Sequence, residues 1–295
     1  MISSYVGRFA PTPSGPLHLG SIIAALGSYL LSKIHNGAYL IRIEDLDYPR
    51  CNKEYTVRIL DTLDKLCIKS DKKILYQSDD LSVYEDACTY LLKKGYAFYC
   101  NCNREKLKST PCTCYKKDLD KKSGYSLRFY HKDLIDDYFL DEIKGKVYFK
   151  DKNLNNFIAL KRSDGIYSYN LAVVVDDIRQ GINHIVRGSD LLDVTAIQNA
   201  LYKAFLKELP SYAHLPLALD INGNKISKQN HAKDILSILS PQKTLKLCLN
   251  ILGQDSFYVD DSMSCSDILD HAITHFDINK IIASNVSIRD LTLYK

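Results

Sequence analysis

The chain has 295 residues, of which 46% are hydrophobic and 25% charged, and its formal net charge is +4. This size holds one large or two ordinary domains, the composition is typical of a soluble globular enzyme, and the mild charge permits nucleic-acid binding without arguing for it. The first residues predict the start of a strand, so no signal peptide is expected, and without a run of about 18 apolar residues no membrane span is expected either. The nine cysteines are therefore expected to be reduced thiols, with metal binding favoured over disulfides.

The first feature of the chain is a stretch from Arg8 to Ser21 that carries three prolines and two glycines. It follows a predicted strand that ends at residues 5–6 and precedes an apolar-periodic segment that predicts a helix over residues 22–34. Such a junction leaves backbone N–H groups at the helix N-terminus, where phosphate binds. His18 adds a donor there, and Arg8, expected at the strand end, can clamp an anion.

A buried strand is predicted over residues 38–43, so the first unit is strand–helix–strand, the usual start of a parallel, doubly wound sheet. Glu44 lies just past that strand, at the sheet edge where such folds bind ligands, and can pair with a substrate ammonium group. Asp45 and Asp47 fit the same edge, or they cap the next helix and pair with Arg50. The helices expected next cover residues 52–66 and 83–94.

Four of the nine cysteines fall within fifteen residues, at Cys100, Cys102, Cys112 and Cys114. Four thiolates at this spacing can surround one tetrahedral zinc ion and stabilise a small insertion that has no core of its own. The Cys-x-Cys spacing is tighter than the usual Cys-x-x-Cys, which leaves the ligand set more open than the site. The alternative is a loop of unligated thiols.

The second half of the chain predicts more strands and then helices. Short strands are expected near residues 125–130 and 146–150, the apolar runs 170–177 and 182–186 are expected to be strands, and a last core strand covers 214–219. Arg187, at the carboxyl end of one of these strands, can make a bidentate bond to a carboxylate. The helices expected here cover residues 191–205, 236–239, 244–252 and 268–276.

A second basic motif, Lys-Ile-Ser-Lys-Gln at residues 225–229, follows a turn at 220–224. This motif resembles the KMSKS loop of class I aminoacyl-tRNA synthetases, and residues 18–21, His-Leu-Gly-Ser, resemble their HIGH region. Residues 8–15 and 42–47 are similar to the glutamyl/glutaminyl branch of that class. The resemblance covers roughly residues 5 to 230.

The resemblance implies an α/β fold and a division of the chain. A Rossmann-like catalytic domain with a doubly wound parallel sheet is expected over residues 1–95 and 126–230, a zinc-binding insertion over 96–125, and a short helical region over 231–295.

The resemblance also implies ATP-dependent adenylation, in which the carboxylate of L-glutamate attacks the α-phosphate of ATP, with Mg²⁺ accompanying ATP. His18, Lys225 and Lys228 are the expected catalytic residues, and Gly20 and Ser21 join His18 and Lys228 in binding ATP. Ser21 stands where the HIGH pattern ends in His, which predicts slower chemistry. The expected glutamate-binding residues are Arg8, Phe9, Ala10, Pro11, Thr12, Glu44, Tyr169 and Arg187.

Three features together resemble glutamyl-Q tRNA(Asp) synthetases. They are the short chain after the motif at residues 225–229, the cysteine insertion, and the sequence His-Leu-Gly-Ser at residues 18–21. That family transfers glutamate to the queuosine base in the anticodon of tRNA(Asp). Its zinc ligands are a Cys-x-Cys pair, a Tyr and a Cys; here Thr110 takes the Tyr position, so Cys112 is expected as the fourth ligand, with Tyr115 a weaker candidate.

Two other functions remain open. The first is a minimal glutamyl-tRNA synthetase that charges a tRNA 3′ end, and the second is an inactive paralogue that binds glutamate or RNA. A cytoplasmic monomer is expected in each case.

Overall fold

The computed structural model describes residues 5–131, 133–149, 157–220, 222–223, 234–256, 259–260 and 262–288. Its helices and strands are, in chain order, β1 (Val6–Phe9), α1 (Leu19–Ile34), β2 (Ala38–Ile43), α2 (Lys53–Lys65), β3 (Leu75–Tyr76), α3 (Ser82–Lys93), β4 (Ala97–Cys100), α4 (Arg104–Ser109), β5 (Ser126–Phe129), β6 (Tyr138–Asp141), β7 (Gly145–Tyr148), β8 (Ala159–Lys161), α5 (Tyr169–Gln180), β9 (His184–Gly188), α6 (Thr195–Ala204), β10 (Ser211–Leu215), β11 (Ala218–Leu219), α7 (Pro241–Ile251), α8 (Cys265–His275) and β12 (Val286–Ser287).

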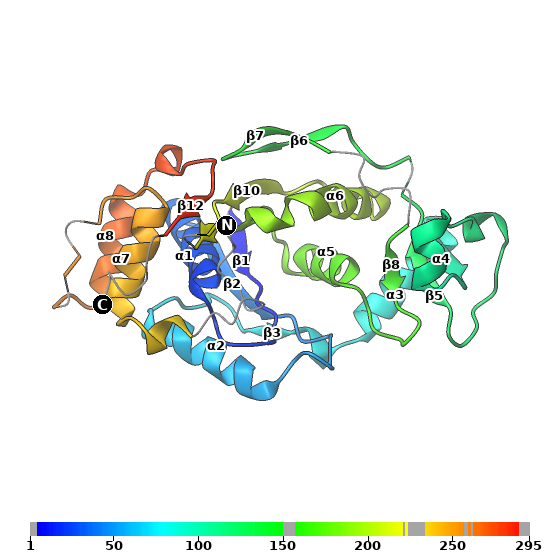
Figure 1. Cartoon of the computed structure of the whole chain (residues 1–295), viewed down its shortest axis with the longest axis horizontal. Helices are drawn as coiled ribbons and strands as arrows, with labels where there is room; N and C mark the ends of the chain where they lie inside the picture. Colours follow the sequence, from blue (N-terminus) through cyan, green and yellow to red (C-terminus); the bar gives the residue numbers. More distant parts are fainter. Residues whose placement is uncertain are drawn as a thin grey trace.

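The centre of the molecule is a layer of parallel strands (Figure 1). β1, β2 and β3 pair in parallel, and β9 pairs in parallel with β10, which in turn pairs with β6. The two groups meet at Asn183, whose N–H donates to the Val6 carbonyl at 3.1 Å and whose Oδ1 accepts from the Val6 N–H at 2.8 Å. The predicted parallel α/β sheet is therefore confirmed.

The first strand and helix have different limits from those expected. β1 extends to Phe9, so Arg8 lies inside the strand rather than at its end. α1 begins at Leu19, three residues early, because His18 adopts an extended conformation and caps it. At the other end, a Cβ on Gly37 would lie 2.5 Å from the Tyr5 carbonyl oxygen, so only glycine fits the turn into β2.

The run 170–177, expected to be a strand, belongs to helix α5. The Ser168 hydroxyl accepts from the Leu171 N–H at the helix start, and Gly181, with φ of +69°, ends it in the left-handed region. The helix is buried over most of its circumference, so its apolar residues are consecutive and hide the helical period. A short, fully apolar run cannot separate a buried strand from a buried helix.

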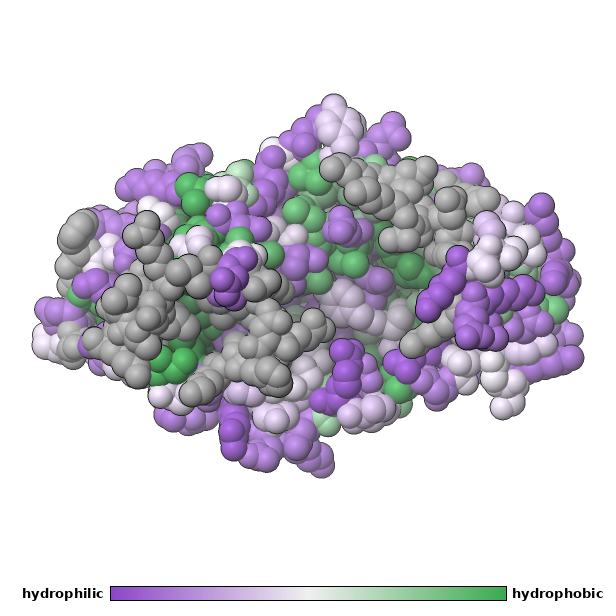
Figure 2. Space-filling model, viewed as in Figure 1, coloured by the Kyte–Doolittle hydropathy of each residue, from purple (hydrophilic) through white to green (hydrophobic). Residues whose placement is uncertain are grey.

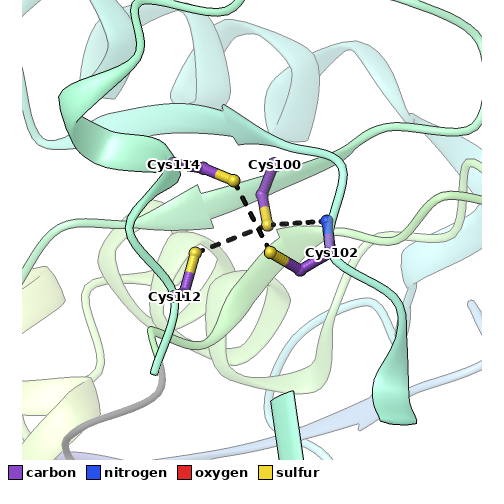
Figure 3. A group of neighbouring side chains, drawn as sticks. All are labelled: Cys100, Cys102, Cys112 and Cys114. Carbon is purple, nitrogen blue, oxygen red and sulfur yellow. Dashed lines mark hydrogen bonds between the residues drawn. The ribbon is translucent and has the colours of Figure 1, made fainter. Parts of the chain in front are cut away.

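A small antiparallel sheet, β4-β5-β8, carries the cysteine-rich segment at one end of the molecule. The four cysteines point toward one another there (Figure 3). Residues 100–125 hold seven Lys or Arg against three Asp or Glu, so this segment by itself has the net charge of +4 that the whole chain has. Figure 2 shows mainly hydrophilic side chains over this end.

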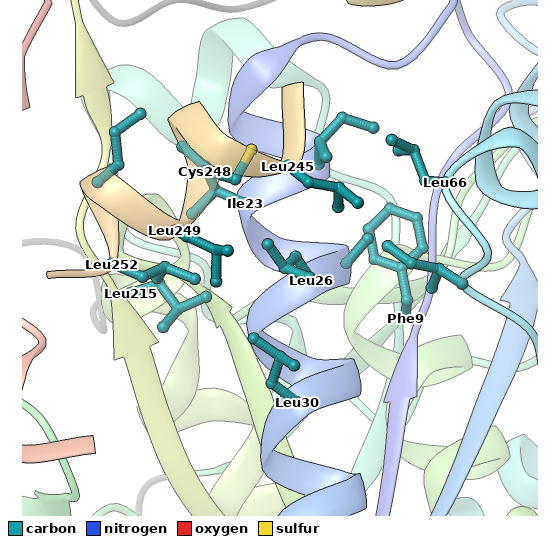
Figure 4. Packing of buried hydrophobic residues seen from close by; sticks show 14 of the residues in the cluster. Phe9, Ile23, Leu26, Leu30, Leu66, Leu215, Leu245, Cys248, Leu249 and Leu252 are labelled. Carbon is teal, nitrogen blue, oxygen red and sulfur yellow. The ribbon is translucent and has the colours of Figure 1, made fainter. Parts of the chain in front are cut away.

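The largest core lies on the face of the sheet that α1 covers. Leu26 and Leu30 of α1 pack with Leu245 and Cys248 of α7 and with residues of α8, all almost fully buried (Figure 4). The core therefore runs from the first helix to the C-terminal helices across residue 231; the division of the chain at that point stays a prediction. Within the part of the chain that the structure describes, no helix combines the length and apolarity that crossing a membrane needs.

Replacing Leu245 by Ala is expected to lower the free energy of unfolding by about 2–5 kcal/mol, because the side chain is fully buried against α1. Denaturant unfolding followed by circular dichroism measures the change. Leu206→Ala is the matched control and should leave the midpoint nearly unchanged, since Leu206 is 79% exposed. Equal unfolding midpoints for the two variants would show that the Leu245 side chain of α7 does not contribute to the stability of the core.

Candidate active site

A cavity of about 290 Å³ opens at the carboxyl ends of β1 and β9, beside the N-terminus of α1. Its lining contains most of the residues expected to bind glutamate or ATP, namely Arg8, Phe9, Ala10, Pro11, Thr12, His18, Gly20, Ser21, Glu44, Tyr169 and Arg187. The structure thus brings together residues from four separate segments. Lys225 and Lys228, the other predicted site residues, lie outside the described residues.

Backbone hydrogen bonds hold the proline-rich segment against the chain that follows β2. The Pro11 carbonyl accepts from the Glu44 N–H, and the Pro13 carbonyl accepts from the Asn52 N–H, both at 3.0 Å. Proline has no N–H to donate, but its carbonyl remains a full acceptor. These bonds fix Glu44 beside the wall formed by residues 8–12.

His18 caps the helix that it precedes. Its Nδ1 accepts from the Ser21 N–H at 3.3 Å. This N–H is therefore bonded within the chain, whereas the sequence predicts unbonded N–H groups at this helix start. A nitrogen that accepts carries no proton, so the neutral ring holds its proton on Nε2. His18 therefore presents a donor at the mouth of α1, next to Gly20 and Ser21.

A buried network of charges lies beneath the cavity. Asp177 of α5 accepts from Arg8 at 3.1 Å and from Arg42 at 2.7 Å, and Arg42 donates to Glu44 at 3.2 Å. All four side chains are at most 6% exposed. Since buried ions are stable only when paired, the two carboxylates depend on the two guanidinium groups for their charged forms.

The network sets the ionisation of its two carboxyl groups differently. Burial opposes ionisation of Asp177, but the two guanidinium groups outweigh it and hold its pKa below the usual range. Burial raises the pKa of Glu44 to about 7, against the lowering effect of Arg42 and Arg8. An ammonium ion in the cavity would favour the charged form of Glu44.

Asp177 is the main residue that the sequence did not assign. Two adjacent acids at positions 176 and 177, inside an apolar run, were the available signal, because a buried carboxylate needs a charged or hydrogen-bonded partner. Asp176 accepts from Gln77 and Tyr84, both at 2.8 Å. By contrast, Asp47 pairs with Arg50, as the structural alternative predicts, but Asp45 accepts from Ser78 and Asn52 caps the next helix, so neither acid acts as its cap.

Arg187 lines the cavity but is already extensively bonded. Its guanidinium donates to His214, Gln198, Thr195 and the Leu191 carbonyl. These bonds use four of the five N–H groups of arginine and leave one for a ligand. In this arrangement Arg187 would reach a carboxylate through one N–H rather than the two expected.

The cysteine cluster has the geometry of a metal site. The sulfur atoms of Cys100, Cys102, Cys112 and Cys114 all lie within 4.8 Å of one another, and two of the pairs are 3.6 Å apart. A metal ion bound tetrahedrally at about 2.3 Å separates its sulfur ligands by about 3.8 Å. Tyr115 instead packs its ring against Phe98, Tyr130 and Phe157, so Cys112 is the better fourth ligand.

The comparisons with known proteins agree with this geometry. The family model of the catalytic domain of class I tRNA synthetases for Glu and Gln matches residues 5–118 and 113–239. A glutamyl-Q tRNA(Asp) synthetase of Vibrio parahaemolyticus is 43% identical over 258 residues, which cover 86% of each chain. The chain belongs to the glutamyl-Q tRNA(Asp) synthetase family. Members from Shewanella amazonensis and Salmonella typhi are 38% and 36% identical, over 95% and 96% of this chain and 95% of each relative.

Solved structures of larger enzymes share the fold. A glutamate tRNA ligase of Elizabethkingia meningosepticum, crystallised with its amino acid, superposes with a TM-score of 0.80 at 24% identity. The superposition covers 96% of this chain and 66% of that one. A glutamate-tRNA synthetase of Elizabethkingia anophelis gives a TM-score of 0.81, with 98% and 68% covered. The family fold is therefore present over nearly the whole chain.

Replacing Asp177 by Asn is expected to destabilise the fold by about 3–5 kcal/mol, because it leaves Arg8 and Arg42 buried without their shared counter-charge. Denaturant unfolding of the purified variant measures this loss. Asp61→Asn removes an exposed pair with Lys65 and should leave the unfolding midpoint unchanged. A stable Asp177→Asn variant would show that the network is not needed for folding.

Proposed function

We propose that this protein activates L-glutamate with ATP and transfers the glutamyl group to queuosine in the anticodon of tRNA(Asp). The observation that carries the proposal is a cavity of mixed charge beside a helix N-terminus, in a chain 36–44% identical to glutamyl-Q tRNA(Asp) synthetases. The mixed charge suits a zwitterionic amino acid, and the helix N-terminus suits a phosphate.

Glutamate has one cationic and two anionic groups, and the cavity offers a counterpart for the ammonium group and for the side-chain carboxylate, while the α-carboxylate is the group that reacts. Glu44 takes the α-ammonium group, while Arg187 and Arg8 face the side-chain carboxylate, with the Tyr169 hydroxyl as a further contact. A guanidinium at the side-chain end favours glutamate over glutamine, because an amide leaves the buried cation without a charged partner.

The reaction needs positioning and charge neutralisation more than covalent help from the protein. An oxygen of the α-carboxylate attacks the α-phosphorus of ATP, the bond to the bridging oxygen of the β-phosphate breaks, and pyrophosphate leaves. His18 donates from Nε2, and Gly20 and Ser21 offer the helix start to the phosphates. Lys225, Lys228 and Mg²⁺ supply the remaining positive charge in this proposal.

Queuosine of tRNA(Asp) is the proposed acceptor because relatives that share most of the chain carry that name. A cationic segment at residues 100–125 supports a polyanionic partner, since clustered lysines raise the local concentration of nucleic acid. The glutamyl group passes from the adenylate to queuosine, and AMP leaves.

Zinc is the proposed metal of the cysteine cluster. Four thiolates at tetrahedral spacing, with no open position, are the usual structural zinc site. The ion would hold together the segment between β4 and β5, whose local core consists of the cysteines, Phe157 and a few neighbouring aromatic and leucine side chains.

The enzyme is expected to catalyse glutamate-dependent exchange between ATP and pyrophosphate, and to transfer labelled glutamate to tRNA(Asp) that contains queuosine. His18→Ala should slow the exchange by about 100-fold, because one preorganised donor to the phosphates is lost. His275→Ala, which alters an exposed histidine of α8, is the matched control.

The alternatives give different results in the same assays. Labelling of tRNA(Glu), but not of tRNA(Asp), would identify a minimal glutamyl-tRNA synthetase. Equal labelling of tRNA(Asp) with and without queuosine would contradict the proposed acceptor. Absence of exchange would indicate a binding paralogue.

Mass spectrometry and elemental analysis of the purified chain are expected to give one zinc ion per chain. Cys100→Ser should lose most of this metal, because a hydroxyl replaces one of four thiolates. Cys88→Ala, a buried cysteine outside the cluster, should keep it. Full zinc content in Cys100→Ser would remove Cys100 from the ligand set.

A further inference from the structure

Arg187 is held from one side by a histidine on the neighbouring strand. His214 of β10 lies directly opposite Arg187 of β9 in the parallel register, and the Arg187 Nε is 3.0 Å from the His214 Nε2. Gln198 and Thr195 of α6 accept from the two terminal nitrogens at 2.7 and 2.9 Å. Arg187 is 4% exposed and His214 is fully buried.

The chain of contacts continues to a third strand. The His214 Nδ1 is 2.6 Å from the Asp141 Oδ2, at the end of β6. The other carboxylate oxygen of Asp141 accepts from the N–H groups of Ile143 and Lys144, at 3.0 and 2.8 Å. Asp141, His214 and Arg187 therefore form a line across β6, β10 and β9 that ends at the cavity.

The hydrogen positions in this line follow from the chemistry of its end members. An arginine can only donate, so the His214 Nε2 must accept and carries no proton. The neutral ring then holds its proton on Nδ1 and donates it to Asp141. Burial lowers the pKa of His214 despite the bond to Asp141, which agrees with a neutral ring.

We propose that Asp141 and His214 are positioning residues: Asp141 fixes the tautomer of His214, and His214 fixes the guanidinium of Arg187 for the side-chain carboxylate of the substrate. The inference rests on the proposed function for the identity of that substrate. Neither residue lines the cavity, so both act only through Arg187. Without the acceptor at Nε2, the guanidinium would lose the bond at Nε, one of the four that hold its orientation.

Two replacements of His214 distinguish the role of its Nδ1, which bonds to Asp141, from the role of its Nε2, which bonds to Arg187. In His214→Asn the amide takes the place of Nδ1 and can still donate to Asp141, but the acceptor for Arg187 is lost. In His214→Gln the longer amide places an acceptor near the former Nε2. The KM for glutamate in the exchange reaction should rise about tenfold in His214→Asn. In His214→Gln the KM for glutamate should return most of the way to the wild-type value. The kcat and the KM for ATP should change little in both variants.

Asp141→Asn tests the tautomer. The Asn oxygen keeps the bonds from Ile143 and Lys144, so its NH₂ group faces the His214 Nδ1 and moves the ring proton to Nε2, against Arg187. The KM for glutamate should rise as in His214→Asn. Tyr212→Phe, on the same strand, is the control: it removes a buried bond to Asn199 but leaves the line intact.

Nitrogen NMR of the histidine ring gives a readout that does not depend on activity. The wild-type chain should show a protonated Nδ1 and a bare Nε2 for His214, and Asp141→Asn should exchange the two. A protonated Nε2 in the wild type would overturn the inference, as would an unchanged KM in His214→Asn. So would an equal rise in KM in His214→Asn and His214→Gln. A wild type without exchange activity but with the expected tautomer would contradict the proposed function and leave the tautomer assignment standing.

Discussion

The arrangement of the cavity depends on one buried carboxylate. Asp177 lies between Arg8 of β1 and Arg42 of β2, and it comes from a helix more than 130 residues further along the chain. Burying three charges is costly, and the cost is offset only when their geometry is correct. The network therefore fixes how α5 sits over the first two strands. Through Arg42 it also fixes Glu44, so the Glu44 carboxylate and the Arg8 guanidinium, which both line the cavity, share one support.

Local chemistry made several parts of this structure predictable. The proline-rich turn, the cysteine cluster, the strand 38–43 and the acid that follows it all depend on residues close together in sequence. The composition of each segment then restricts its conformation, as proline does by removing donors and cysteine does by its affinity for metals. The predicted glutamate-binding residues line one cavity, and most of them belong to β1, to the turn that follows it or to the carboxyl ends of β2 and β9, whereas Tyr169 begins a helix that the sequence does not predict.

The remaining features depend on partners that are distant in sequence. Asp141 accepts from His214, 73 residues away, and nothing near Asp141 in the sequence indicates that it will be buried. Helix α5 was mistaken for a strand because burial on most sides removes the polar face from which a helical period is recognised. The extent of bonding around Arg187 likewise follows only from the packing of β9 against α6 and β10.

The pairing of β11 with β12, and the packing of α1 against α7 and α8, have a consequence for how the protein is made. A ribosome releases the first helix and strands long before it has synthesised the segments that cover them. During that interval, α1 exposes Leu26 and Leu30, side chains that the finished protein buries completely. The apolar face of α1 therefore stays uncovered until α7 and α8 have been synthesised, so the order of synthesis delays completion of the main core.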